Sequence, residues 1–231
     1  MEILVVSSPG ATAAAHWSKA AAGAFCRLAS ARGGGVRWFV ALHGDEETPA
    51  GGDGVQVVSF RERREHALHD VAASQRDPAL ERALTESARA APGCAVVHFG
   101  LGAQGSPNLL WLAERLGSRV FAVARGAELV CHRGDLLDRE QRPCRAWDDA
   151  ERCRWCCARP GWSWRARPRA DDLRNRADLL VASLHVCEAV LVEAEADAQL
   201  VAALGVPAKR VKVGADVAAT VDLVCGGAPA A

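Results

Sequence analysis

Short apolar runs alternate with longer amphipathic stretches along most of the chain. Each run spans only a few residues and lacks strict polar–apolar alternation, which is typical of strands buried on both faces of a parallel sheet. In order, the runs are EILVVS (2–7), VRWFVAL (36–42), VQVVSF (55–60), AVVHF (95–99), RVFAVA (119–124), ADLLVAS (177–183) and RVKV (210–213). We expect each of them to form a strand.

The stretches between these runs repeat their apolar residues at helical spacing. The first helix is indicated by Trp17, Ala21, Phe25 and Leu28, and the charged, Ala-rich segment 61–91 predicts surface helices. Residues 184–204 predict one long helix, which Gly205 and Pro207 would end. Alternating strands and helices predict an α/β fold, with a Rossmann-like parallel sheet and helices on both faces. Ligands of such sheets bind at the carboxyl ends of the strands.

Composition narrows the class of protein. Half of the 231 residues are apolar, which is enough for one large domain over residues 1–225, with a frayed tail at 226–231. Lys plus Arg (28) equal Asp plus Glu (28), so charge attracts neither nucleic acid nor, beyond peripheral contact, a membrane. The start MEILVVSS is too short for a signal sequence or a membrane span. We therefore expect a cytoplasmic protein with reduced thiols.

A cysteine-rich insertion loop is expected over residues 125–169. Four cysteines have the spacing C-x12-C-x8-C-x2-C, which predicts a structural zinc site because thiolates are preferred ligands of Zn²⁺. The ligands would be Cys131, Cys144, Cys153 and Cys156, with Cys157 an alternate to Cys156 and His132 an alternate to Cys131. Buried reduced thiols and a redox pair are the competing interpretations. Cys26, Cys94, Cys187 and Cys225 lie in apolar runs and are expected to pack as small core residues.

Two further features suggest binding chemistry. The segment from Gly100 to Gly105 matches G-x-G-x-x-G between a strand and a helix, the context of an NAD(P)-binding fingerprint. The acidic residue that would bind the ribose is missing, because the following strand ends in Arg125. An NAD(P)-binding oxidoreductase is therefore only an alternative function. The segment from Arg152 to Arg169 interleaves Arg with three Trp residues, which is typical either of a phosphate, sugar or lipid contact or of a flap over the cysteines.

Several motifs, taken in order, give the chain a family resemblance. They are VVHF with His98, VFAVARGAELVCHRGDLL, RPCRAWDDAERCRWCC, and ADLLVAS followed by GVPAKRVKV. Together they resemble the N-terminal domain of the family 4 glycosyltransferases of GT-B fold, in the members with a cysteine-bearing insertion. The resemblance implies an acceptor-side domain, which in that family is joined to a second domain that binds the nucleotide sugar.

The sequence also departs from this family. The second domain does not follow, and the family's His-Asp pair after the fifth strand is replaced by Arg125-Gly126. We therefore expect no autonomous sugar transfer, no nucleotide cofactor for this chain alone, and a separate donor-binding chain as partner. A sugar or lipid-linked acceptor is the expected ligand, and no catalytic residue is assigned. The candidate ligand-binding residues near strand ends are Gly10, His98, Arg125, Glu128 and Arg133. A non-catalytic module whose zinc loop contacts a partner or a membrane surface is the other alternative.

Overall fold

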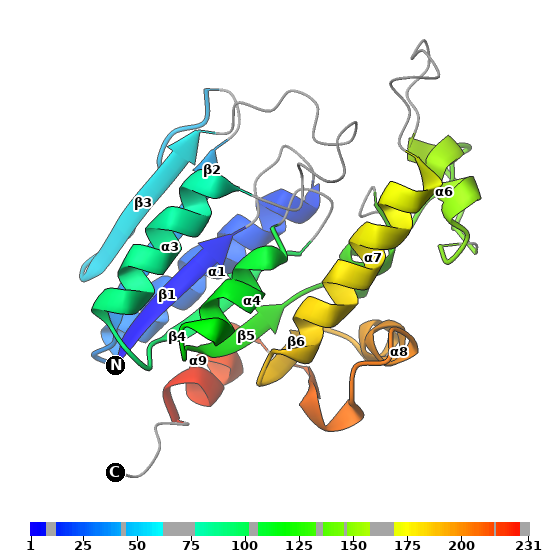
Figure 1. Ribbon diagram of the computed structural model, residues 1–231. Coiled ribbons are helices and arrows are strands. Elements are labelled where there is room, and N and C mark those ends of the chain that lie inside the picture. Colours follow the sequence, from blue (N-terminus) through cyan, green and yellow to red (C-terminus); the bar gives the residue numbers. More distant parts are fainter. Residues whose placement is uncertain are drawn as a thin grey trace.

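The fold is built on one seven-stranded parallel sheet with the order β3-β2-β1-β4-β5-β6-β7 (Figure 1). The structure, a computed structural model, describes residues 1–7, 13–42, 45–61, 77–101, 106–132, 136–145, 147–157, 169–214 and 216–226. The strands are β1 (Glu2–Ser7), β2 (Gly35–Leu42), β3 (Val55–Arg61), β4 (Ala95–Phe99), β5 (Arg119–Val123), β6 (Ala189–Val192) and β7 (Val211–Val213). The predicted Rossmann-like α/β fold is confirmed.

Helices cover both faces of the sheet. Helices α1 (Ala13–Ala31) and α9 (Val217–Gly226) pack against one face and against each other. The opposite face is covered by α3 (Pro78–Ala90), α4 (Asn108–Arg115), α7 (Ala170–His185) and α8 (Glu195–Ala203). Between β5 and α7 lie the short helices α5 (Gly126–Val130) and α6 (Ala150–Cys157), and a 3₁₀ turn, Ala208–Arg210, leads into β7.

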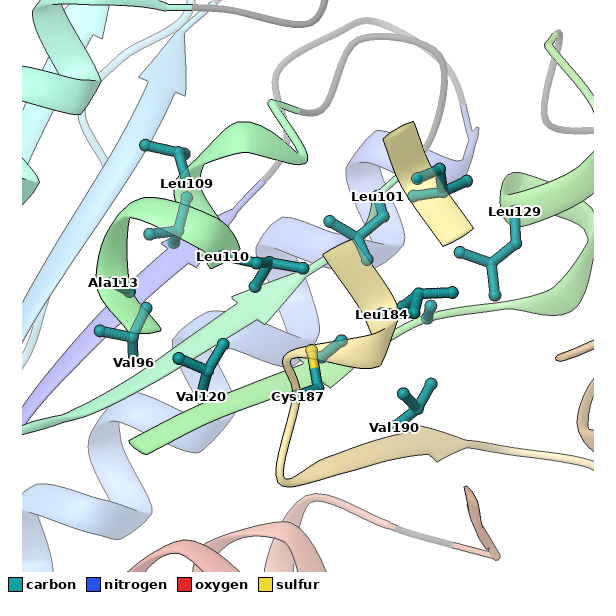
Figure 2. Packing of buried hydrophobic residues seen from close by; sticks show 14 of the residues in the cluster. Val96, Leu101, Leu109, Leu110, Ala113, Val120, Leu129, Leu184, Cys187 and Val190 are labelled. Carbon is teal, nitrogen blue, oxygen red and sulfur yellow. The ribbon is translucent and has the colours of Figure 1, made fainter. Parts of the chain in front are cut away.

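Each face of the sheet has its own hydrophobic core. On the α4/α7 face, Leu109 and Leu110 of α4 and Leu184 of α7 belong to one cluster with the strand residues Val96, Val120 and Val190 (Figure 2). On the α1/α9 face, Phe25 and Phe99 meet with ring centroids 5.5 Å apart. Because both faces are covered, successive residues of a central strand are all buried, which explains the continuous apolar runs in the sequence.

The prediction of a strand at 177–183 is wrong. These residues belong to α7, whose buried side chains Leu173, Arg176, Leu180 and Leu184 recur at helical spacing. The run LLVA within it is too short to distinguish a strand from a single helical turn. The helical period becomes visible only when Arg176, a charged residue, is counted among the buried positions.

The prediction of one long helix over 184–204 is also wrong. The helix α7 ends at His185, and the four-residue strand β6 occupies Ala189–Val192 before α8 begins at Glu195. All four residues of β6 are buried between β5 and β7. Gly205, with a φ of 84°, follows α8 as the sequence predicted. The correction moves a strand end to Glu193, which thereby lies at the carboxyl edge of the sheet.

The strand order reverses between β1 and β4, because the chain proceeds to β2 and β3 on one side and to β5, β6 and β7 on the other. In parallel α/β sheets the crevice beside such a reversal, at the carboxyl ends of the strands, is the usual ligand site. His98 lies at this point, on β4 and paired in register with Val6 of β1. Among the described residues, no helix has the length and apolar character that a membrane span would need.

Candidate functional site

A cavity of about 420 Å³ opens at the carboxyl ends of the last four strands of the sheet. Its walls come from α1, from the ends of β4 and β5, and from the residues that follow β6 and β7. We call it the edge cavity. Its lining residues are Trp17, Ala20, Ala21, Phe99, Val123, Glu193, Gly214, Asp216, Val217 and Thr220. The cavity therefore combines aromatic walls with two carboxylates, a mixture suited to a small polar ligand.

A polar triad borders this cavity. The Trp17 indole donates a hydrogen bond from Nε1 to Glu193 Oε1 at 2.8 Å. The Arg125 guanidinium lies over the Trp17 ring, 4.5 Å from its centroid, and its Nε is 3.4 Å from Glu193 Oε2. Arg125 thus contacts both partners of the Trp17–Glu193 hydrogen bond. The predicted candidate Arg125 is placed beside the edge cavity, although it does not line it.

Gly126, which stands where the resembling family has Asp, is constrained by α8. Its backbone N–H donates to Asp197 Oδ1 at 2.8 Å. A Cβ added to Gly126 would lie 2.7 Å from that oxygen, 2.8 Å from Leu200 Cδ1 and 2.9 Å from the Asp197 Cα. A side chain at position 126 would therefore displace α8 or α5, so an Asp at this position does not fit the packing.

His98 is buried at the end of β4. Neither ring nitrogen has a hydrogen-bond partner among the described residues. Burial lowers the pKa of His98 to about 4, opposed only by the nearby backbone of Phe99, so the ring is neutral at pH 7. A buried, neutral imidazole without a partner is an unusual cost in a folded protein, and such groups concentrate at functional sites.

Glu128 is buried on α5. Burial raises its pKa to about 7, and the charges of Asp197 and Glu193 add to this while Arg125 opposes it. The Leu101 backbone also lowers this pKa, yet neither Glu128 carboxyl oxygen has a partner of hydrogen-bond geometry among the described residues. Glu128 is therefore a carboxyl group held near its midpoint at neutral pH, adjacent to the loop that follows β4.

A second and larger cavity, of about 730 Å³, contains the predicted metal ligands. We call it the cysteine cavity, after the Cys131, Cys144, Cys153, Cys156 and Cys157 side chains that line it together with His132, Leu137, Asp138, Arg139, Glu140, Arg142, Pro143, Arg145, Trp147, Arg152 and Trp155. The spacing of the sequence thus identified residues that the fold brings to one place, although they span 27 positions from Cys131 to Cys157.

A small hairpin presents Cys144 to this cavity. Leu137 and Pro143 form an isolated antiparallel bridge, and Cys144 N donates to Leu136 O at 2.7 Å. The turn is closed by Asp138, whose Oδ1 accepts from the backbone N–H groups of Glu140 and Arg142 at 2.9 and 2.8 Å. These hydrogen bonds lower the pKa of Asp138. Local hydrogen bonds therefore fix the approach of Cys144.

Helix α6 presents Cys153 and Cys156 from the other side. Asp149 caps the helix, because its Oδ1 accepts from the backbone N–H groups of Glu151 and Arg152 at 3.0 and 3.1 Å. The two thiols are three residues apart and so point from one face of the helix. They donate to backbone carbonyls, Cys153 to Trp147 and Cys156 to Leu137, each at 3.7 Å.

The thiols of the cysteine cavity influence one another. Burial, and after it the proximity of Cys131, Cys144 and Cys156, raises the pKa of Cys153 to about 12. A nucleophilic or redox cysteine needs the opposite, a lowered pKa. Within the described part of the chain, no three His, Cys, Asp or Glu side chains are arranged to hold a metal ion. Zinc binding therefore stays a prediction.

Arg176 of α7 is buried beside these thiols. Its Nη1 lies 3.5 Å from His132 Nδ1, and its Nη2 donates to the Leu101 carbonyl at 3.3 Å. Burial lowers the pKa of Arg176 to about 10, and nearby Cys157 and Cys131 oppose that shift. Burial and the Arg176 charge also lower the pKa of His132 to about 4. Arg176 therefore connects the cysteine cavity to the segment after β4.

Some predicted residues lie outside the described residues. These are Gly10, Arg133, Gly102 and Gly105, together with Trp162 and Trp164 of the Arg/Trp segment. The NAD(P) fingerprint is thus described only at Gly100 and Leu101. Of the expected core cysteines, Cys26, Cys94 and Cys187 are buried, and Cys225 is partly exposed.

Sequence reasoning missed Trp17, Glu193 and Arg176 as site residues. Trp17 was assigned to the apolar face of a helix, and the sequence does not indicate that its indole nitrogen donates a hydrogen bond. Glu193 directly follows the apolar run AVLV, and a correct assignment of β6 would have placed it at the carboxyl edge. Arg176 has no sequence signal except its helical spacing with Leu173 and Leu180.

Comparisons with known proteins leave the family open. No protein-family model matches the chain, and no curated protein does. The resemblance to family 4 glycosyltransferases therefore rests on the sequence motifs alone, and the structure carries a Rossmann-like α/β fold with two distinct cavities at one edge of its sheet.

Proposed function

We propose that this chain is a glycosyltransferase-like acceptor-side domain that works with a separate donor-binding chain. The observation that carries the proposal is the edge cavity, which combines aromatic side chains and carboxylates at the carboxyl ends of the strands. Aromatic rings offer flat apolar surface to a sugar ring, and carboxylates accept hydrogen bonds from its hydroxyl groups. The motifs that resemble the family 4 enzymes are a second, independent support.

The proposed reaction needs two halves. The acceptor hydroxyl forms the new glycosidic bond while the bond from the donor sugar to its nucleoside diphosphate breaks, and the hydroxyl proton leaves with the diphosphate. In a two-domain enzyme of this kind, the domain that binds the nucleotide stabilises the departing diphosphate, and the other positions the acceptor. The Arg125–Trp17–Glu193 triad, two members of which line the edge cavity, would position the acceptor in this scheme.

Binding of simple sugars tests the acceptor role. The probes are the methyl glycosides of glucose, galactose, mannose and N-acetylglucosamine, and glucose 1-phosphate, with saturation-transfer NMR as the readout. At least one probe should bind, and Trp17→Ala should weaken it about tenfold, since a stacked aromatic side chain contributes up to about 1.5 kcal/mol and tenfold in affinity is about 1.4 kcal/mol. The matched control is Trp111→Ala, because Trp111 is 40% exposed on α4 and does not line the edge cavity. Absence of binding by every probe would contradict the acceptor role.

Turnover tests the requirement for a second chain. The purified chain, given a nucleotide sugar and the glycoside that binds, should transfer no sugar. Addition of a donor-binding chain encoded beside it should restore transfer. Sugar transfer by this chain alone would show that the proposed division of labour is wrong.

The second candidate is a non-catalytic module that contacts a partner or a membrane surface. One observation favours it: Trp155, on α6 at the cysteine cavity, is 48% exposed, and the Arg154 guanidinium lies 5.4 Å from its ring centroid. Cosedimentation with vesicles of phosphatidylglycerol and phosphatidylcholine separates the candidates. Binding that Trp155→Ala removes, in a protein that binds none of the glycosides, would favour this module.

A further inference from the structure

Beside the cysteine cavity, the positive charge of Arg176 is buried without a negatively charged partner among the described residues. Five thiols line the cavity, from the end of α5, the hairpin at 136–144 and the helix α6. The guanidinium of Arg176 is buried beside Cys131 and Cys157. Within the described part of the chain, its polar contacts are the His132 ring and the Leu101 backbone carbonyl, and no carboxylate faces it. A buried cation of this kind is costly unless an anion lies near it.

Four thiolates around one Zn²⁺ would supply that anion. The zinc ion carries two positive charges and each thiolate one negative charge, so the group as a whole is negative. Its negative charge would favour the buried guanidinium, and the guanidinium would in turn stabilise the thiolates. The two features that are unusual separately, clustered cysteines and a buried arginine without a carboxylate, then explain each other.

We propose that Cys131, Cys144, Cys153 and Cys156 bind one Zn²⁺ as thiolates, and that Arg176 is the positioning and charge-balancing residue of this site. Cys153 and Cys156 would leave the carbonyls of Trp147 and Leu137 and turn to the metal. Four protein ligands leave no position for water or substrate, so the site is structural. Binding releases the thiol protons to solvent and involves no oxidation or reduction.

Through Arg176 the metal site would also brace the segment after β4. Arg176 Nη2 holds the Leu101 carbonyl, which lies three residues beyond His98. The same α7 side chain therefore contacts both the cysteine cavity and the strand end where ligands are expected. The zinc site would fix the position of this segment without contacting the ligand.

Metal content of the wild-type protein is the first test. Protein purified without chelator should contain close to one equivalent of zinc, and cobalt exchanged into it should give the absorption of a tetrahedral tetrathiolate. Cys144→Ser and Cys156→Ser should lose the metal, whereas Cys225→Ser, a partly exposed cysteine on α9, should retain it. Zinc below about half an equivalent in the wild type, or disulfides among these cysteines, would overturn the proposal. Because the wild type is measured first, a variant that does not fold leaves the test intact.

The role of Arg176 is tested by zinc affinity, measured by chelator competition on folded protein. Arg176→Met should lower the affinity about 10- to 100-fold, the usual effect of losing a group that supports metal ligands, and Arg176→Lys should restore part of it. Arg174→Met is the matched control, since Arg174 lies on the same helix, exposed and paired with Asp171. Equal zinc affinity in Arg176→Met and Arg174→Met would exclude the charge-balancing role and leave only a packing role.

Discussion

The edge cavity and the cysteine cavity lie at the same end of the sheet but are built in opposite ways. The edge cavity is bordered by groups that satisfy one another, since Glu193 accepts from Trp17 and pairs with Arg125. The cysteine cavity is lined by buried and half-buried thiols, and beside it lies Arg176, a buried arginine whose charge has no carboxylate partner among the described residues. The edge cavity is complete without an ion, and we propose that a zinc ion completes the cysteine cavity.

The difference separates a binding role from a structural role. Paired, half-exposed polar groups can exchange one hydrogen bond for another when a ligand arrives, at little cost. Buried groups that lack partners need a permanent partner, because the protein bears their desolvation at all times. On this basis we propose that the edge cavity is the ligand site and the cysteine cavity a structural site. His98 and Glu128 also belong to the second kind, because both are buried and lack hydrogen-bond partners in the described part of the chain.

Zinc removal should produce the largest effect and confine it to one region. With a chelator present, amide hydrogen exchange in 136–145 and α6 should rise more than about 100-fold, because structural zinc contributes about 10 kcal/mol or more to small zinc modules. Exchange in β1 (Glu2–Ser7) should stay unchanged. Mass spectrometry of peptic fragments provides both measurements. Equal acceleration in β1 and α6 would show that the two regions do not unfold separately.

Glu128→Gln should stabilise the protein by about 3 kcal/mol at pH 8, and by little at pH 4. The folded pKa of about 7 lies above the ordinary value of 4.5, so folded protein holds this proton more tightly. That contribution to stability is present below pH 4.5 and is lost as pH rises to 7, where burial of the charged carboxylate becomes a cost. Urea unfolding at the two pH values measures it.

The control for Glu128 is Glu193→Gln, because Glu193 is half exposed and ion-paired. Its effect should be below about 1 kcal/mol at both pH values. If the free energy of unfolding changed equally with pH in the two variants, burial would not be the cause of the raised pKa of Glu128.

His98→Met should change stability by a similar amount with the opposite dependence on pH. The folded pKa of about 4 lies below the ordinary 6.5, so the unfolded chain binds this proton more tightly. The wild type should lose about 3 kcal/mol relative to His98→Met as pH falls from 6.5 to 4. Urea unfolding across this pH range measures the difference. Equal losses of stability in the wild type and in His98→Met would contradict the prediction.

Gly126→Ala should destabilise the protein by about 1–3 kcal/mol, because the added Cβ meets Asp197 and Leu200 of α8. Gly126→Asp, whose side chain is larger, should destabilise it at least as much and should create no transferase activity. Gly226→Ala is the control, since a Cβ there meets no atom within 4 Å. Thermal unfolding gives the stabilities, and a Gly126→Asp protein as stable as the wild type would contradict the packing argument.

The sequence predicted the sheet best where strands are buried on both faces. The runs at 2–7, 36–42 and 95–99 are continuous and apolar, and each is a strand in the structure. The run at 177–183 looked the same but belongs to α7, because a short apolar segment contains no information about its period. The strand β6 was lost inside a predicted helix for the same reason.

The candidate sites, too, could be predicted only where a local pattern in the sequence carries information. Cysteine spacing located the cysteine cavity, since cysteines are rare enough for their grouping to carry information. The edge cavity was missed, because Trp17 and Glu193 are 176 positions apart and meet only through the fold. His98 and Glu128 were identified from their places near strand ends, but their lack of partners is a property of packing that no local pattern records.

The central claim is that the edge cavity, and not the cysteine cavity, binds the ligand, and one measurement tests it directly. Hydrogen exchange of the zinc-loaded chain, with and without the methyl glycoside that binds best, locates the ligand. We predict protection around Trp17 on α1 and in Asp216–Thr220, with no change in 136–145 or α6. Protection confined to 136–145 and α6 would show that the cysteine cavity is the ligand site and that this account is wrong.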